Sequence, residues 1–155
     1  MPDSSKLLKG RYSAPYHHYS VTLCSKNRAK IFNQLRVNQI TIHEVYQLEY
    51  DGAIKLIAYT LMPDHLHLLF QLQAIDSLSG VVRSLKGRVA AKLRAINVHQ
   101  VWQRGFYDTC LIDERDLKTQ ARYIVANPLR AKLVNNIDQY PYWNCIYLYQ
   151  GIGDL

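Results

Sequence analysis

The chain has 155 residues, of which 48% are hydrophobic and 20% are charged, as is ordinary for a single folded soluble domain. No apolar run approaches the roughly 18 residues that span a bilayer, and the N-terminus lacks a signal-peptide core, so we expect a cytoplasmic protein without membrane contact. Three widely spaced cysteines without a Cys-x-x-Cys pair argue against a disulfide framework and a structural zinc site.

Positive charge is concentrated in one part of the sequence. The formal net charge is +7, and the stretch from Ser77 to Tyr107 contains no Asp or Glu. Such a stretch attracts a polyanion, most naturally nucleic acid, although it could also be an ordinary solvated helix face. Its basic residues are Arg83, Lys86, Arg88, Lys92, Arg94 and Arg104.

The first half of the chain predicts a flexible basic arm followed by strand, helix, strand and strand. Alternation of apolar and polar residues indicates the strands, and Asp51-Gly52 and Pro63-Asp64 indicate turns. The predicted ranges are 1–11 for the arm, 16–25 for the first strand, 31–49 for the helix, 54–61 for the second strand and 65–72 for the third.

The second half predicts a helix, a strand, another helix and an aromatic-rich tail over residues 135–155. Ser77 can cap a helix that ends near Ile96, and Asp113 can cap a helix that ends near Asn127. A strand is predicted between them, within residues 102–112. The order βαββαβ predicts an α+β fold, a ferredoxin-like antiparallel sheet with an additional C-terminal helix, as one domain over residues 1–155.

The most informative motif is His65-Leu66-His67, at the start of the third predicted strand. Side chains at i and i+2 of a strand share a face, so both imidazoles project side by side. They could be hydrogen-bonded core residues, or they could share one metal ion that satisfies both rings. In the ferredoxin-like order the third strand is central, which places the pair at the rigid middle of the sheet.

A second motif lies on the last predicted helix, where Tyr123 and Asn127 are four residues apart and share a face. They could simply pack and cap the helix. A tyrosine can also attack a phosphodiester, and a metal ion on the scissile phosphate assists that reaction. With His65 and His67, the Asn127 amide oxygen would give mixed nitrogen and oxygen ligation, which suits Mg²⁺ or Mn²⁺ more than structural zinc.

Six segments together resemble one known family, the HUH single-strand nucleases, and within it the REP-associated tyrosine transposases. The joint occurrence of these segments in order is specific, whereas no single segment is. They are residues 16–22, 61–69, 102–108 and 123–131, the pair Leu85-Lys86, and the weaker match 140–143. The pair Trp143-Asn144 departs from the Trp-Ser that we would expect in this family.

The resemblance implies a transposase that cleaves and rejoins single-stranded DNA beside a hairpin formed by a palindromic repeat. It implies that Tyr123 is the nucleophile, forming a 5′-phosphotyrosine, that His65 and His67 bind a divalent metal, and that Asn127 is the third ligand. Related small insertion-sequence transposases tend to have Gln at this last place, so Asn favours the REP-associated branch. The resemblance leaves open whether the protein is a monomer or a homodimer.

The DNA is expected to contact the basic residues of the chain. We predict phosphate contacts from Arg83, Lys86, Arg88 and Arg104. Further contacts are predicted from the basic arm, through Lys6, Lys9 and Arg11.

Other readings of the sequence remain open at this point. Tyr107 and Tyr59 are rival nucleophiles, although neither has a ligand four residues on. A non-catalytic ferredoxin-like module that binds single-stranded nucleic acid would carry aromatics on its third strand, where this chain has His65 and His67. A phosphoesterase with paired His-x-Thr/Ser motifs is disfavoured, because neither histidine is followed at i+2 by Thr or Ser.

Overall fold

A computed structural model describes residues 13–147. The predicted basic arm, with Lys6, Lys9 and Arg11, lies outside the described residues, as do residues 148–155 of the predicted tail.

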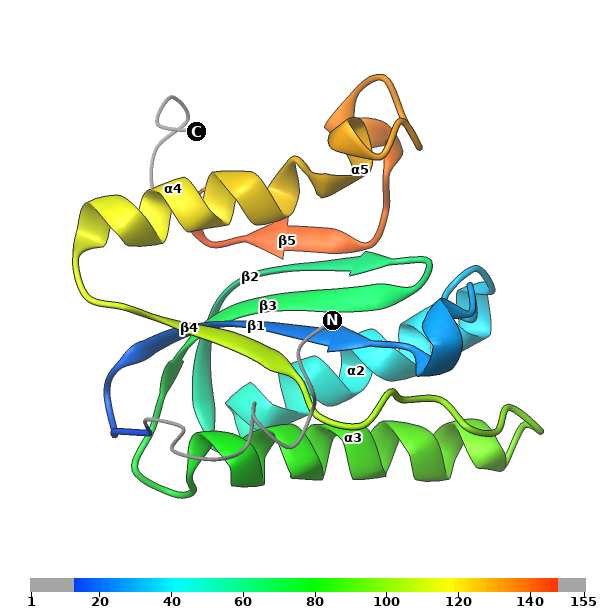
Figure 1. Ribbon diagram of the computed structural model, residues 1–155, viewed down its shortest axis with the longest axis horizontal. Coiled ribbons are helices and arrows are strands. Elements are labelled where there is room, and N and C mark those ends of the chain that lie inside the picture. The colour runs from blue at the N-terminus through cyan, green and yellow to red at the C-terminus, as the bar shows by residue number, and fades with distance from the viewer. Residues whose placement is uncertain (1–12, 148–155) are drawn as a thin grey trace.

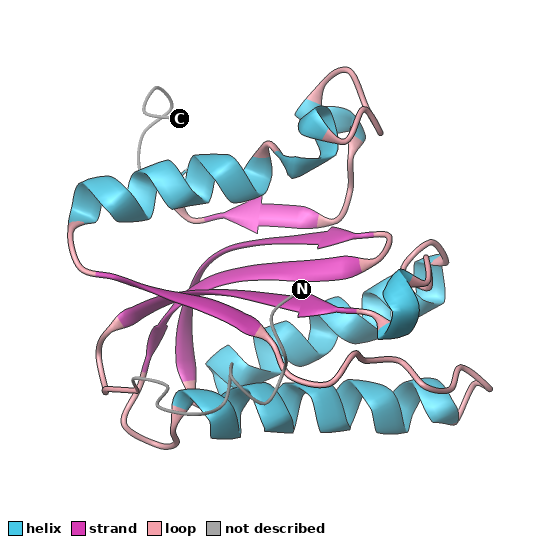
Figure 2. Ribbon diagram, viewed as in Figure 1, coloured by secondary structure: helices cyan, strands magenta, loops and turns pink. Residues whose placement is uncertain are grey.

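The centre of the fold is an antiparallel sheet in the order β4-β1-β3-β2-β5 (Figures 1 and 2). The first four strands and the helices between them have the ferredoxin-like connection, which confirms the predicted fold class. The strands are β1 (His18–Cys24), β2 (Ile54–Met62), β3 (His65–Leu72), β4 (Tyr107–Leu111) and β5 (Trp143–Cys145). The helices are α2 (Leu35–Tyr50), α3 (Leu78–Arg94), α4 (Glu114–Val125) and α5 (Asn127–Arg130), with short 3-10 turns η1 (Lys26–Arg28) and η2 (Ile137–Gln139).

Helices cover the two faces of the sheet unequally. α2 and α3 pack on one face, and α4 lies across the other (Figure 1). The larger apolar core lies under α2 and α3 and includes Leu66 and Leu68 of β3. The smaller core lies under α4 and includes Leu69 and Ile124. Because strand side chains alternate, His65 and His67 project to the α4 side.

The fourth strand is shorter than predicted, because residues 102–106 form a loop packed on α3. The Trp102 indole N–H donates to the carbonyl of Lys86, 3.1 Å away. In return the Lys86 ammonium donates to the carbonyls of Gln103 and Gly105, at 2.8 and 2.6 Å. These reciprocal bonds satisfy the loop backbone without strand pairing, apart from one bridge from Trp102 to Ser25.

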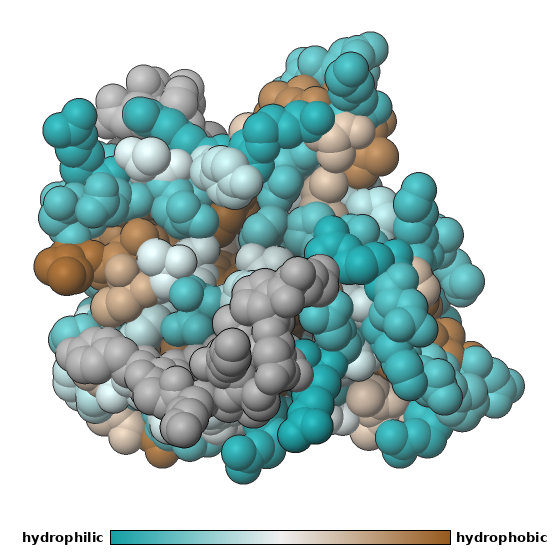
Figure 3. Space-filling view, viewed as in Figure 1, coloured by the Kyte–Doolittle hydropathy of each residue, from teal (hydrophilic) through white to brown (hydrophobic). Residues whose placement is uncertain are grey.

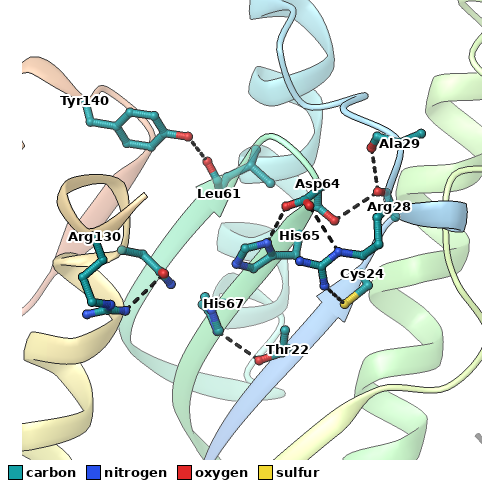
Figure 4. Close-up of polar contacts among 12 residues, drawn as sticks. Thr22, Cys24, Arg28, Ala29, Leu61, Asp64, His65, His67, Arg130 and Tyr140 are labelled. Atoms are coloured by element: carbon teal, nitrogen blue, oxygen red, sulfur yellow. Dashed lines mark hydrogen bonds and ion pairs between the residues drawn. The ribbon is translucent and has the colours of Figure 1, made fainter. Parts of the chain in front are cut away.

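The predicted tail contributes an unpredicted edge strand, β5, which pairs with β2. The segment before β5 is attached to the end of β2, since the Tyr140 hydroxyl donates to the Leu61 carbonyl (Figure 4) and the Leu61 N–H donates to the Tyr142 carbonyl.

Hydrophilic residues dominate the face drawn in Figure 3, and apolar residues occur there in small separate groups. Within residues 13–147, no helix is long and apolar enough to cross a membrane.

Candidate active site

His65 and His67 begin the central strand β3, directly after the two-residue turn Pro63-Asp64. The register places His65 between Cys24 and Met62, and His67 between Thr22 and Thr60. The two rings meet edge to face with centroids 4.7 Å apart (Figure 4). The pair therefore occupies one face at the middle of the sheet.

The Nδ1 atom of each imidazole already has a partner. His65 Nδ1 donates to Asp64 Oδ1 at 2.6 Å, and His67 Nδ1 shares a hydrogen bond with Thr22 Oγ1 at 3.0 Å (Figure 4). Metal-binding histidines typically engage their second nitrogen in this way, which fixes the tautomer and the ring orientation. Both Nε2 atoms are thereby left as the nitrogens that can bind a ligand.

Asp64 is held as a carboxylate by its neighbours. Arg28 Nε donates to Asp64 Oδ2 at 3.1 Å, and Arg28 Nη1 donates to Cys24 Sγ at 3.0 Å. Partial burial opposes ionisation of Asp64, but the hydrogen bonds and charges of His65 and Arg28 outweigh it and lower the pKa of this carboxyl. Asp64 thus accepts from His65 throughout the neutral range.

Both histidines are neutral near pH 7. Burial lowers the pKa of His65, partly offset by Asp64. Burial also lowers the pKa of His67 to about 3, with further contributions from the charges of His65, Arg130 and Arg28. A neutral imidazole is the form that binds metal ions.

Tyr123 is brought beside the histidines by a hydrogen bond from β2 to the carbonyl of the next residue, Ile124. Pro128 has no N–H, so the Ile124 carbonyl lacks its usual donor four residues on. The buried Thr60 hydroxyl replaces it at 2.8 Å. Because Thr60 is the partner of His67 across β2 and β3, this bond places the Tyr123 ring next to the His67 ring, with centroids 6.5 Å apart.

Tyr123 is 52% exposed, so the residue is accessible from solvent. A second bond, from Gln120 Nε2 to Ser20 Oγ at 2.8 Å, ties the same helix to β1.

Asn127, at the start of α5, has an amide that is only half satisfied. Its Oδ1 accepts from Arg130 Nη2 at 3.1 Å, while its buried Nδ2 has no partner in the described part of the chain. An amide oxygen has two lone pairs, so Asn127 Oδ1 can accept from Arg130 and still offer a lone pair to a cation.

The donor set therefore fits a divalent metal with mixed ligands. Two imidazole nitrogens and one amide oxygen are available from His65, His67 and Asn127. Among residues 13–147, no group of three or more His, Cys, Asp and Glu side chains could hold a metal ion. Asn127 remains the predicted third ligand.

The predicted DNA-binding residues of α3 lie away from this site, since α3 packs on the opposite face of the sheet. Arg83 and Arg104 line a groove of about 490 Å³ between α3 and residues 102–106. Lys86 is engaged by the loop carbonyls, and Arg88 pairs with Asp51 at 3.0 Å. The structure does not bring these four residues to the histidines, and their DNA contacts stay predictions.

The rival tyrosines differ in position. Tyr59 is only 5% exposed and belongs to the core under α2 and α3. Tyr107 pairs with Thr22 and so lies on the same face as His67, two strands away. Of these three tyrosines, Tyr123 is the one for which a ring contact with His67 is observed.

Sequence reasoning missed four side chains that complete the site, namely Thr22, Arg28, Thr60 and Arg130. Pro128 indicates from sequence alone that the Ile124 carbonyl lacks its regular helical donor. The identity of the replacement donor, Thr60, depends on the packing of α4 on β2 and could not be predicted. The sequence predicts Asp64 only as a turn residue, although a carboxylate adjacent to a predicted metal ligand is a natural hydrogen-bond partner for that ligand.

Several known proteins are similar to this chain. The family model described as "Transposase IS200 like" matches residues 13–127. A curated Haemophilus influenzae protein named as a REP-associated tyrosine transposase is 26% identical over 136 residues, covering 80% of this chain and 77% of that protein. The REP-associated tyrosine transposase of Escherichia coli is 22% identical over 105 residues, covering 67% of this chain and 62% of that protein.

A solved structure has the same fold. It is a REP-associated tyrosine transposase bound to a REP hairpin, and it matches with a TM-score of 0.73 at 20% identity. The match covers 86% of this chain and 79% of that one.

Proposed function

The chain belongs to the family of IS200-like transposases, and on that premise we propose that it is a metal-dependent single-strand endonuclease and strand transferase acting at hairpin-forming DNA repeats. The observation that carries the proposal is the juxtaposition of a solvent-accessible tyrosine, Tyr123, with two neutral imidazoles, His65 and His67. Asn127 lies one helical turn from the tyrosine and completes the donor set.

In the proposed reaction the Tyr123 hydroxyl oxygen attacks the scissile phosphorus and loses its proton to solvent. The 3′ oxygen of the upstream strand leaves with the bonding electron pair and takes up a proton. The products are a 5′-phosphotyrosine and a free 3′-hydroxyl. Attack by a 3′-hydroxyl on the phosphotyrosine reverses the step and joins strands, because the phosphodiester energy is kept in the protein–DNA bond.

The protein residues prepare this step in distinct ways. Asp64 and Thr22 orient the two imidazoles, and Thr60 holds the nucleophile's helix against β2. When Mg²⁺ or Mn²⁺ is bound by His65, His67 and Asn127, it supplies Lewis acidity toward the scissile phosphate.

A hairpin is the proposed partner because the solved relative is bound to a REP hairpin and the two curated relatives are named for REP association. The net charge of +7 supports a polyanionic partner. Of the four predicted phosphate contacts, Arg83 and Arg104 line the groove beside α3, whereas Lys86 and Arg88 are engaged by other residues of the chain.

The test is covalent trapping on single-stranded repeats that flank the protein's own gene, labelled at the 3′ end so that the attached fragment is visible. We expect the wild-type chain to form a DNA-linked species with Mg²⁺ or Mn²⁺, and Tyr123→Phe to form none while still binding the hairpin. Tyr107→Phe is the matched control, since it removes a phenol on the same face, and it should retain adduct formation.

Three outcomes would count against the proposal. An adduct formed by Tyr123→Phe would show that the nucleophile is misassigned. Cleavage that persists in excess EDTA would refute metal dependence. Hairpin binding by the wild-type chain without any covalent product would indicate a binding module instead.

A further inference from the structure

The proposed nucleophile and the proposed third ligand share one neighbour, Arg130, at the end of α5. The Arg130 guanidinium carbon lies 3.7 Å from the centroid of the Tyr123 ring. The same guanidinium donates through Nη2 to Asn127 Oδ1 at 3.1 Å. One cation thus contacts two of the four residues on which the proposed function depends.

We infer that Arg130 is a positioning residue, which fixes the ring of Tyr123 and the amide of Asn127 in one arrangement before DNA arrives. The inference rests on the proposed function, because it assigns the role of Arg130 relative to that nucleophile and that ligand.

Tyr123 needs such a restraint because its side chain is half exposed. An exposed side chain moves among several rotamers, and holding it in one costs entropy. The His67 ring flanks the tyrosine with ring centroids 6.5 Å apart and the two ring planes nearly perpendicular. Arg130 covers one face of the tyrosine ring through a cation–π contact at close range.

The spacing of Tyr123, Asn127 and Arg130 explains how the Arg130 side chain can contact the other two residues at once. Tyr123, Asn127 and Arg130 follow one another at intervals of four and three residues, which is the helical spacing of neighbours on one face. α4 and α5 are separated only by Ala126, so this face continues from one helix into the next.

Arginine suits this double contact better than lysine. The planar guanidinium can stack on an aromatic ring while an N–H in its plane donates to an amide oxygen, whereas an ammonium is a point charge without a stacking face. Lysine at position 130 should therefore preserve the charge but lose the arrangement.

The experiment compares Arg130→Gln and Arg130→Lys with Lys132→Gln in the full chain. Lys132 is exposed and lies two residues further on, so its substitution removes the same charge without touching Tyr123. Single-turnover adduct formation at saturating DNA measures the chemical step, and hairpin titration measures binding. A third measurement uses 3-fluorotyrosine in place of Tyr123 and its ¹⁹F spectrum in protein free of metal and DNA.

We expect Arg130→Gln to slow adduct formation by about 5- to 100-fold, the range produced by a misplaced reacting group. Hairpin affinity should stay within about twofold of wild type, and Arg130→Lys should not restore the rate. The ¹⁹F signal should move toward that of an unrestrained tyrosine in both Arg130 variants and stay unchanged in Lys132→Gln.

Two results would overturn the inference while leaving the proposed function intact. In the first, both Arg130 variants match Lys132→Gln in rate and in ¹⁹F signal. In the second, the loss appears in hairpin affinity and is recovered by lysine, which would make Arg130 an ordinary phosphate contact. If the wild-type chain itself gives no Tyr123 adduct, the proposed function is what fails.

Discussion

Asp64 is the side chain that connects a surface cation to the proposed metal site. It accepts from Arg28 on one oxygen and from His65 on the other, and both contacts lower the pKa of its carboxyl. A carboxylate in this position makes the ring more basic at Nε2 and keeps the proton on Nδ1. The affinity for metal should therefore depend on a residue that does not touch the metal.

We predict that Asp64→Asn weakens Mn²⁺ binding by about 10- to 100-fold, the usual effect of losing such a partner. The isosteric amide keeps the shape of the site and removes only the charge. Calorimetric titration of the DNA-free chain with Mn²⁺ measures the effect. Asp51→Asn is the matched control, because Asp51 pairs with Arg88 on a distant helix. Equal affinities for the two variants would show that Asp64 has no part in metal binding.

At the scale of an element, α4 is held in position by a hydrogen bond from β2 to a carbonyl at its C-terminal end, where the regular helical bond is missing. Pro128 removes the donor that the Ile124 carbonyl would otherwise have, and Thr60 of β2 supplies one. The proline therefore does more than end a helix, because it removes the regular i+4 donor from a buried carbonyl to which the Thr60 hydroxyl of β2 donates.

We predict that Thr60→Val lowers the free energy of unfolding by about 1 to 3 kcal/mol, the cost of leaving a buried carbonyl unpaired. Adduct formation should slow as well, since Tyr123 is the next residue before Ile124. Urea denaturation gives the stability change. Thr41→Val is the control, since Thr41 is equally buried and bonds the Val37 carbonyl, which keeps its own helical donor. A similar loss in both variants would contradict the argument.

How much of the fold could be predicted depends on whether an element carries its own signal. The bounds of β3 are predictable because a run of mostly apolar residues from His65 to Leu72 directly follows a Pro-Asp turn. The predicted fourth strand begins too early. The apolar residues Trp102 and Phe106 belong to a loop that packs on α3, and they do not form part of the hydrogen-bonded strand. β5 has three residues and exists only because β2 offers an edge, which no local pattern reveals.

The candidate site divides in the same way. The i, i+2 and i, i+4 spacings were enough to place His65 with His67 and Tyr123 with Asn127 on shared faces. Thr22 and Thr60 could not be found, because register between distant strands brings them to His67. The spacing of Arg130 from Tyr123 and Asn127 can be read from the sequence. The sequence does not show that this exposed arginine contacts both residues.

At the scale of the whole molecule, the sheet separates two surfaces that DNA is expected to use. Tyr123 and the histidines lie on the α4 side, whereas the groove lined by Arg83 and Arg104 lies beside α3. The loop of this groove leads directly into β4, the edge strand. The β4 edge is therefore one path along which a DNA strand would contact both surfaces.

We predict that Arg83→Gln and Arg104→Gln each reduce the slope of log affinity against log salt by about 0.7 to 0.9, as expected for one phosphate contact. Lys86→Gln should leave that slope unchanged and lower the melting temperature, because it releases the carbonyls of residues 102–106. Hairpin titrations at several salt concentrations, with thermal melts, measure both quantities. A reduced slope in Lys86→Gln alone would reverse these assignments.

The turn between Met62 and His65 has a consequence for which length changes the protein can tolerate. Strand side chains alternate with a period of two, so one residue added to or removed from the turn would exchange the faces of β3 if the turn kept its two-residue form and the pairing with β2 slipped by one residue. Leu66 and Leu68 would then meet α4, and both imidazoles would enter the apolar core. The site is therefore encoded as much in the parity of a two-residue turn as in the identity of its histidines.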